Sequence, residues 1–173
     1  MKKIIITSIA ILGVGTVSAQ NATLNVRLKP IQTLVVNDAQ KVVNLDYVTK
    51  ANYADGVSSL NADHLNIFST GGFQVRVKSG SSALQNGNKN IQTNTIQIKA
   101  TAGSDAVNGA QYSQNVLLSD SESILVSSPN GGADKKINVE YKGAGGNAYI
   151  DNYIAGQDPT VYTTELTYTI VSQ

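Results

Sequence analysis

The 173-residue chain contains no cysteine and no tryptophan, and it has only one histidine and three prolines. Without cysteine, a disulfide, a thiolate metal site and a lipid anchor attached to cysteine are all excluded. Charged residues make up only 14% of the chain and balance to a formal net charge of +1. This balance gives no electrostatic basis for binding nucleic acid or an anionic membrane surface. The fold must therefore be held together by backbone pairing and apolar burial.

The chain also lacks an apolar run long enough to span a membrane. Its longest run, Ile4–Val14, follows Lys2 and Lys3 and precedes the small residues of Val17-Ser18-Ala19. This order predicts a secretory signal peptide at residues 1–19, with a retained amino-terminal anchor as the alternative. Cleavage before Gln20 would remove two lysines and change the formal charge from +1 to −1. The remaining chain has the length of one domain with a sizeable core.

The rest of the sequence consists of short alternating segments and shows no sustained helical period. Apolar and polar residues alternate, or nearly so, in residues 42–47, 64–68, 73–78, 95–99, 137–141 and 162–171. Residues 31–36 and 123–126 are more continuously apolar, which is typical of strands covered on both faces. Turn-forming clusters separate these segments at residues 71–72, 79–82, 86–88, 130–132 and 143–147. The pattern predicts an all-β fold with one β-sandwich domain.

The segment directly after the predicted signal peptide has the clearest alternation. Its apolar residues are Ala22, Leu24, Val26 and Leu28, and Pro30 ends the run because proline has no N–H for a strand ladder. A strand in this position either forms the first strand of its own sandwich or is offered to another molecule. Alternation alone leaves both possibilities open.

The last alternating segment is equally informative. Tyr162, Leu166, Tyr168 and Ile170 share one face of the predicted strand, and the sequence stops three residues after Ile170. An exposed apolar edge invites unwanted pairing unless something covers it. The amino-terminal segment, from the same molecule or from a neighbour, is the expected cover.

Residues 21–31 and 161–170 together resemble the two ends of subunits of chaperone–usher fimbriae, in particular the cysteine-free, alpha-type (CS1-like) major subunits. In that family an alternating strand ending at a proline precedes a second apolar strand, and an alternating last strand carries a tyrosine near its end. The resemblance implies an immunoglobulin-like β-sandwich that lacks its final strand. It also implies polymerisation by donor-strand exchange, a form of strand addition to a sheet edge.

The resemblance assigns a role to each part of the chain. Residues 20–30 would be the donor-strand extension, and residues 31–173 the pilin-like domain. The inserting side chains would be those of Ala22, Leu24, Val26 and Leu28. The acceptor groove would be bordered by the terminal strand, with Tyr162, Leu166, Tyr168 and Ile170 facing the core.

The same resemblance implies partners and a location. The partners would be identical or homologous pilin subunits, a periplasmic chaperone and an outer-membrane usher. The subunit would be exported, pass through the periplasm and end in a surface fimbria that supports adhesion or biofilm formation. Catalysis, a cofactor, nucleic acid and membrane insertion of the mature chain are not expected.

Two other functions stay open at this stage. A self-contained secreted sandwich that binds a glycan is one, because Tyr149 and Tyr153 lie in a loop-like stretch with amide and carboxylate side chains that suits stacking on sugars. A small hydrolase is the other, and His64 would be its only possible imidazole base. We expect His64 at the surface or at a strand edge.

A metal site has little support in the sequence. No spacing of acidic residues matches a calcium loop. Asp151, Asn152 and Asp158 offer oxygen ligands near Gly156, but we expect these side chains to be solvated in a loop rather than bound to calcium.

Overall fold

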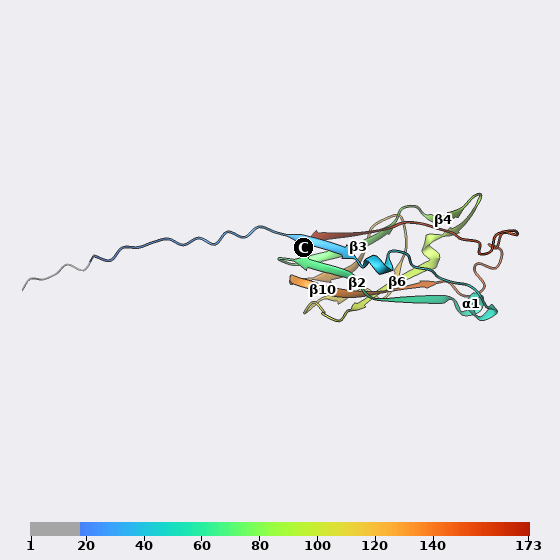
Figure 1. The fold of residues 1–173 in the computed structure, drawn as a ribbon, viewed down its shortest axis with the longest axis horizontal. Helices are drawn as coiled ribbons and strands as arrows, with labels where there is room; N and C mark the ends of the chain where they lie inside the picture. The colour runs from blue at the N-terminus through green and yellow to red at the C-terminus, as the bar shows by residue number, and fades with distance from the viewer. Residues whose placement is uncertain (1–17) are drawn as a thin grey trace, which may run out of the picture.

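The computed structural model describes residues 18–173, in which the alternating segments pair into two antiparallel sheets packed face to face (Figure 1). The first sheet has the spatial order β1 (Gln32–Val36), β2 (Val57–Ser69), β10 (Gly132–Gly143), β6 (Ile96–Ala102) and β8 (Val116–Leu117). The second has the order β11 (Leu166–Ser172), β3 (Phe73–Ser79), β9 (Ser123–Ser128) and β7 (Gln111–Tyr112). The predicted all-β sandwich is confirmed. The predicted signal peptide lies, apart from residues 18 and 19, outside the described residues.

Smaller elements connect these strands. A separate hairpin is formed by β4 (Ala83–Asn86) and β5 (Lys89–Gln92). Its two-residue turn begins at Gly87, whose φ of +55° suits glycine and matches the turn predicted at residues 86–88. Within residues 18–173, the helical elements are the α-helix α1 (Lys50–Asp55) and two 3₁₀ turns, η1 (Asp38–Gln40) and η2 (Thr93–Thr95).

The core lies between the two sheets and follows from the period-2 pattern of their strands. Alternate residues of β3 and β6 are buried, because successive side chains on a strand point to opposite faces. The largest fully buried apolar side chains come from both sheets: Phe73, Leu65, Ile67, Ile98, Leu125, Ile137, Val75, Val77, Val126 and Val139.

Four details of the predicted strands are wrong. Residues 42–47 form no strand, and the strand predicted over residues 162–171 begins only at Leu166. β1 is an edge strand with Thr33 and Val35 exposed, and Ile124 of β9 is also exposed, so neither strand is covered on both faces. Composition shows that a segment is apolar, but not how many sheets or neighbours will cover it.

The short helix α1 was not expected from periodicity, because six residues are too few to show a helical period. Its local signal is a cap. The side chain of Thr49 accepts a hydrogen bond from the Asn52 backbone N–H, and the Asn52 side chain accepts one from the Thr49 backbone N–H. This reciprocal pair fixes the start of α1 at one end of the sandwich.

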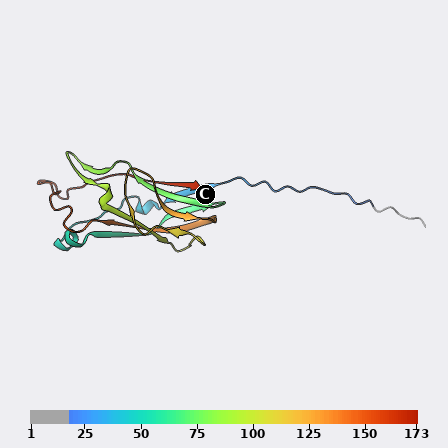
Figure 2. The ribbon, with the colours of Figure 1, turned by 180° about the vertical axis from the view of Figure 1, so that it is seen from behind.

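The two sheets close against each other at one edge for only part of their length. β1 and β11 are edge strands of different sheets and lie in contact at the end of the sandwich that carries the carboxyl terminus (Figures 1 and 2). After Val36 and before Leu166 the chain leaves these strands and runs toward α1. The contact between the edges is therefore limited to one half of the sandwich.

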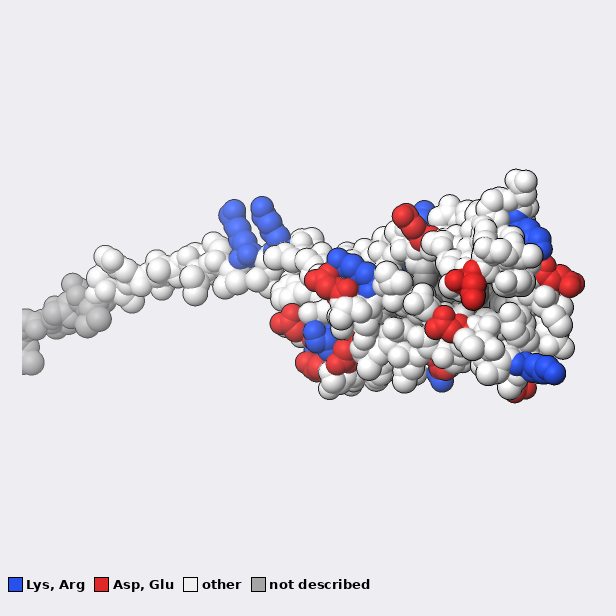
Figure 3. Space-filling view, turned by 45° about the vertical axis from the view of Figure 1, so that its right-hand side comes forward, with Lys and Arg blue, Asp and Glu red and all other residues white. Residues whose placement is uncertain are grey.

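Residues 18–30, called the tail below, leave the sandwich as an extended segment with no strand pairing and with every residue exposed. The tail projects from the end where β1 and β11 meet and points away from α1 (Figures 1 and 3). Among the described residues, none of the helices has the length and hydropathy that a membrane crossing requires.

Candidate docking groove and donor segment

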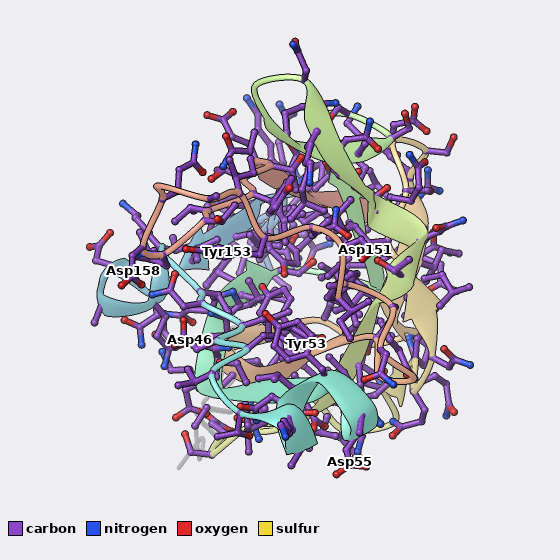
Figure 4. The ribbon with its side chains drawn as sticks, turned by 90° about the vertical axis from the view of Figure 1, so that its right-hand side faces the viewer. Asp46, Tyr53, Asp55, Asp151, Tyr153 and Asp158 are labelled. Carbon is purple, nitrogen blue, oxygen red and sulfur yellow. The ribbon has the colours of Figure 1, made fainter. Side chains whose placement is uncertain are left out.

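An open groove lies where the two sheets part. Two adjoining hollows of about 630 and 670 Å³ share the lining residues Val43, Leu45, Leu84, Ile96 and Tyr162, so they form one continuous depression. One rim consists of residues 41–48 and the other of residues 160–168; we call this depression the edge groove. It opens at the α1 end of the molecule, opposite the tail. Figure 4 views that end, with Tyr153 above and Tyr53 below the opening.

The first rim has the side-chain pattern of a strand without a strand's partner. Val43, Leu45 and Tyr47 are half-buried toward the groove, while the alternate residues Asn44 and Asp46 are exposed. The Tyr47 hydroxyl donates a hydrogen bond of 2.7 Å to the Ala144 carbonyl, and its ring packs against those of two other tyrosines. Burial raises the pKa of Tyr47. This rim is thus anchored at its end but unpaired along its length.

The second rim is paired on one side only. Thr163 exchanges backbone hydrogen bonds of 3.1 and 3.3 Å with Gln85, and Gly80 donates one of 2.8 Å to the carbonyl of Glu165. Because antiparallel pairing alternates along a strand, the backbone groups of the even-numbered residues 162, 164, 166 and 168 point the other way, toward the groove. Within the described chain, no further strand pairs with β11 on that side. The groove therefore offers a strand edge as well as an apolar floor.

The floor of the edge groove is polar at its closed end. The Tyr168 hydroxyl is hydrogen-bonded to that of Tyr141, and the Tyr141 hydroxyl lies 2.8 Å from His64 Nε2. His64 Nδ1 lies 3.0 Å from Gln40 Oε1, and Gln40 Nε2 donates to the Ala62 carbonyl. Because the Gln40 amide is oriented by Ala62, we assign the His64 proton to Nδ1 and the acceptor role to Nε2. Every member of this chain of hydrogen bonds is satisfied.

His64 is 2% exposed, which corrects the expected surface or strand-edge position. The residue type alone could not reveal this, because its burial depends on the partners Gln40 and Tyr141, which are distant in sequence. Both ring nitrogens bond to these side chains rather than to a serine or threonine hydroxyl. Burial lowers the pKa of His64, and burial also raises the pKa of Tyr141 to about 12.

We expect the protein to lose stability as the pH falls below the ordinary histidine pKa of 6.5. The unfolded chain takes up a proton there while buried His64 resists it, so the stability is fully present above 6.5 and declines toward the lower folded-state pKa. Urea unfolding between pH 7.5 and 5 measures the decline. A His64→Gln variant should be less stable at pH 7.5 by about 1–3 kcal/mol and should show a flatter pH profile. An equal decline in both proteins would contradict this role for His64.

The tail is an unpaired extended segment, and the open edge of the groove lacks such a neighbour. The side chains of Leu24, Val26 and Leu28 are 90%, 78% and 89% exposed, and Ala22 is exposed as well. Isolated exposed aliphatic residues are common on protein surfaces, but three on one face of an extended segment form an apolar stripe. The tail thus presents one apolar face of a strand to solvent.

The sequence-predicted site residues fall into two groups. Tyr162, Leu166 and Tyr168 line the edge groove, whereas Ile170 lies farther along β11 and packs against the core. Sequence reasoning missed the opposite rim at Val43 and Leu45, although it recognised the alternation there. It also missed the floor residues Leu84, Ile96 and Leu118, which come from separate parts of the chain.

Comparisons with known proteins give no assignment: no family model matches the chain, and no curated protein matches it. The groove and the tail are therefore the features from which a function has to be inferred.

The residues considered for calcium lie at the open end of the groove. Asp151 and Asp158 are exposed there (Figure 4), and the Lys89 ammonium donates a hydrogen bond to the Asp151 backbone carbonyl. Across residues 18–173, no three His, Asp or Glu side chains come together as a metal site requires.

Proposed function

We propose that this protein is the structural subunit of a surface fimbria, in which the tail of one copy enters the edge groove of the next by donor-strand exchange. One observation carries the proposal: the same chain has an exposed alternating segment without a sheet and an apolar strand edge without a neighbour. Strand addition to an open sheet edge joins two such features, with backbone hydrogen bonds providing affinity and alternate side chains providing specificity.

The lengths of the two features agree. The rim is free of bends only over residues 43–48, because Lys41 has helical backbone angles; these six residues span about 20 Å at the rise of a β-strand. The alternating part of the tail, residues 22–28, has seven residues and spans about 23 Å. One tail can therefore fill one groove.

The energy of insertion is large for a non-covalent contact. Burying Leu24, Val26 and Leu28 stabilises the complex by roughly 5–9 kcal/mol, since each large aliphatic side chain contributes about 1.5–3 kcal/mol. Each new backbone hydrogen bond adds about 0.5–1.5 kcal/mol. Because the inserted strand would share the core of its host, its release would require partial unfolding and would be slow.

More of the tail enters the groove when the tail inserts into a neighbouring copy than when it folds back within its own molecule. The tail joins β1 at the closed end of the sandwich, and the groove begins near Val36, about 17 Å farther along this five-residue strand. If the tail folded back within the same molecule, about five of its residues would run along β1 before the tail reached the groove. Val26 and Leu28 would then lie over the β1–β11 contact instead of inside the groove.

The positions of the tail and the groove also favour a linear polymer. The tail leaves one end of the sandwich and α1 lies at the other (Figure 1), where Tyr53 of α1 lines the open end of the groove. A contact between two different surfaces of identical subunits is heterologous, and it produces a filament when the rotation between subunits does not close a ring. Such a filament suits adhesion or biofilm formation at the cell surface.

The proposal also includes assembly partners. An unfilled apolar groove is an aggregation hazard, so a periplasmic chaperone would cover it before assembly, and an outer-membrane usher would exchange the chaperone for a tail. The signal peptide predicted at residues 1–19 would deliver the chain to that compartment.

Purified mature protein should form a ladder of oligomers on SDS gels without boiling and a single monomer band after boiling. Slow release of the inserted strand is the reason. Deleting residues 20–29 should remove the ladder while leaving the circular dichroism spectrum unchanged, because the tail has no strand pairing in the free subunit. A ladder that survives the deletion would exclude the tail as the donor.

A glycan-binding function is the second candidate, favoured by the tyrosines at the open end of the groove. Tyr53 and Tyr153 line it together with Asn152 and Asp158, a composition that can stack on and hydrogen-bond to a sugar. Tyr149, in contrast, is buried and hydrogen-bonded to Thr95. A glycan array probed with the monomer tests this candidate; binding lost in Tyr153→Ala without any effect on polymer formation would support it.

A further inference from the structure

We propose that one ion pair sets the register of the tail in the edge groove of a second copy: Arg27 of the tail lies beside Asp46 of the receiving subunit. The tail then runs antiparallel to β11, with Ala22 over the polar floor at the closed end. This inference rests on the proposed function and goes beyond it, because it names the residue pair that aligns the two copies.

The direction follows from where the groove opens. The body of the donating copy must stay outside the groove, at the end marked by α1 and Tyr53. Leu28, the inserting residue nearest to that body, therefore lies at the open end, and Ala22 reaches the closed end. β11 runs from Leu166, on the groove side, toward the closed end, so the two strands are antiparallel.

The floor of the groove matches this direction. Near the closed end, the floor includes the hydroxyl and imidazole groups of Tyr168, Tyr141 and His64. The aliphatic side chains of Leu45, Leu84 and Ile96 lie where the two hollows join, and tyrosine side chains line the open end.

The size of the inserting side chains changes in the same order. The smallest, Ala22, arrives at the hydroxyl and imidazole groups of the closed end. The larger Leu24 and Val26 meet aliphatic surface, and Leu28 meets tyrosine rings at the open end. The opposite direction would press Leu28 onto the hydroxyls of Tyr168 and Tyr141 and would leave only Ala22 against the tyrosine rings of the open end.

The register follows from matching the inward residues of the tail and the rim. Leu24, Val26 and Leu28 then lie beside Val43, Leu45 and Tyr47 in turn, because both segments have a side-chain period of two. The outward residues are matched at the same time, and Arg27 falls beside Asp46. A shift by two residues would keep the apolar match but would place Arg27 beside Asn44 or Val48.

Charge supports this register. Asp46 is exposed at the mouth of the groove, which it helps to line, and in the part of the chain that the structure describes it forms no ion pair. The one lysine on that rim, Lys41, is paired with Asp38 at 2.5 Å. The opposite rim carries Glu165, which is also exposed. Opposite charges on neighbouring strands stabilise their pairing and fix the register.

Charge reversal tests the Arg27–Asp46 pair in the full mature chain. Arg27→Asp and Asp46→Arg should each slow polymer growth about fivefold at low salt, because like charges then face each other. The double variant Arg27→Asp/Asp46→Arg restores opposite charges at every junction and should polymerise within twofold of wild type. In 0.5 M salt the single-variant defects should shrink, because exposed charges are screened.

The matched control reverses the other basic residue of the tail. Lys29→Asp combined with Asp46→Arg should not be rescued, because Lys29 lies two residues beyond the pair. If the two single-variant defects in growth rate multiply in the Arg27→Asp/Asp46→Arg double variant, with no rescue, the register is wrong. Wild-type protein would still form ladders that depend on residues 20–29 in that case, so the proposed function would stand. Ladders that form without residues 20–29 would overturn both the register and the proposed function.

A second pair of variants tests the direction independently. Ala22→Leu should slow polymer growth at least fivefold, because a large aliphatic side chain would meet the hydroxyls of Tyr168 and Tyr141. Ala22→Ser adds a small polar group at the same place and should polymerise within twofold of wild type. If Ala22→Leu polymerises as fast as wild type, the tail enters in the opposite direction.

Discussion

Val26→Asp is expected to abolish the polymer, with growth falling at least a hundredfold. In the free subunit the side chain of Val26 is 78% exposed, so a carboxylate there remains in water. In the edge groove the same carboxylate would lie beside Leu45, and the lysine of that rim, Lys41, is already paired with Asp38; burying an unpaired charge is costly. Light scattering and unboiled SDS gels measure the loss.

The matched control for Val26→Asp is the neighbouring substitution Asn25→Asp. It adds the same charge on the outward face of the inserted strand, where the carboxylate remains solvated, and it should reduce growth by no more than a few-fold. Both variants should keep the wild-type thermal midpoint as monomers. Normal ladders from Val26→Asp would show that Val26 does not enter the groove.

Ile170→Asp should instead damage the folded subunit itself, with a loss of about 2–4 kcal/mol in the free energy of unfolding. Ile170 is half-buried on β11 and packs against the core, beyond the end of the groove. Its carboxylate replacement would lie between the sheets in the monomer as well as in the polymer. Urea denaturation of the monomer measures the effect.

Thr167→Asp provides the comparison on the same strand. Thr167 is exposed and lies opposite Lys78 of β3, so its replacement should change the free energy of unfolding by less than about 0.5 kcal/mol. An Ile170→Asp subunit as stable as Thr167→Asp would mean that this part of β11 does not hold the sandwich together.

These two predictions separate surfaces that look alike in the sequence. Val26 and Ile170 both belong to alternating or nearly alternating segments near the ends of the chain. Periodicity predicted the strand character of each segment, but it could not decide which one packs on its own core. That distinction depends on tertiary contacts. β11 pairs with β3, whereas the tail pairs with no strand of the described part of the chain.

Residues 42–47 also show that alternation does not reveal whether a segment has a partner strand. Their alternation predicts a strand, and the structure keeps the alternation of Val43, Leu45 and Tyr47 but gives the segment no ladder. A period-2 pattern indicates one face turned toward the core. It carries no information about whether a neighbouring strand is present, which is why this rim was mistaken for a paired strand.

The hydrogen bonds of the polar floor could not be predicted from the sequence, because their members are far apart along the chain. His64 follows the rule that buried polar groups are hydrogen-bonded, but its partners Gln40 and Tyr141 are 24 and 77 residues away. A sequence can show that a histidine is the only one in a chain. It cannot show that a glutamine and a tyrosine will meet both of its ring nitrogens.

The central claim, that the edge groove is a vacant site for a tail, is tested most directly by supplying the tail as a peptide. The acceptor is the full mature Val26→Asp subunit, whose own tail carries a charge, and the ligand is a synthetic peptide of residues 20–30. We predict one-to-one binding by calorimetry and a rise of at least 5 °C in the thermal midpoint, with no change from a peptide that carries Val26→Asp. An unchanged midpoint and no binding heat at millimolar wild-type peptide would contradict the account.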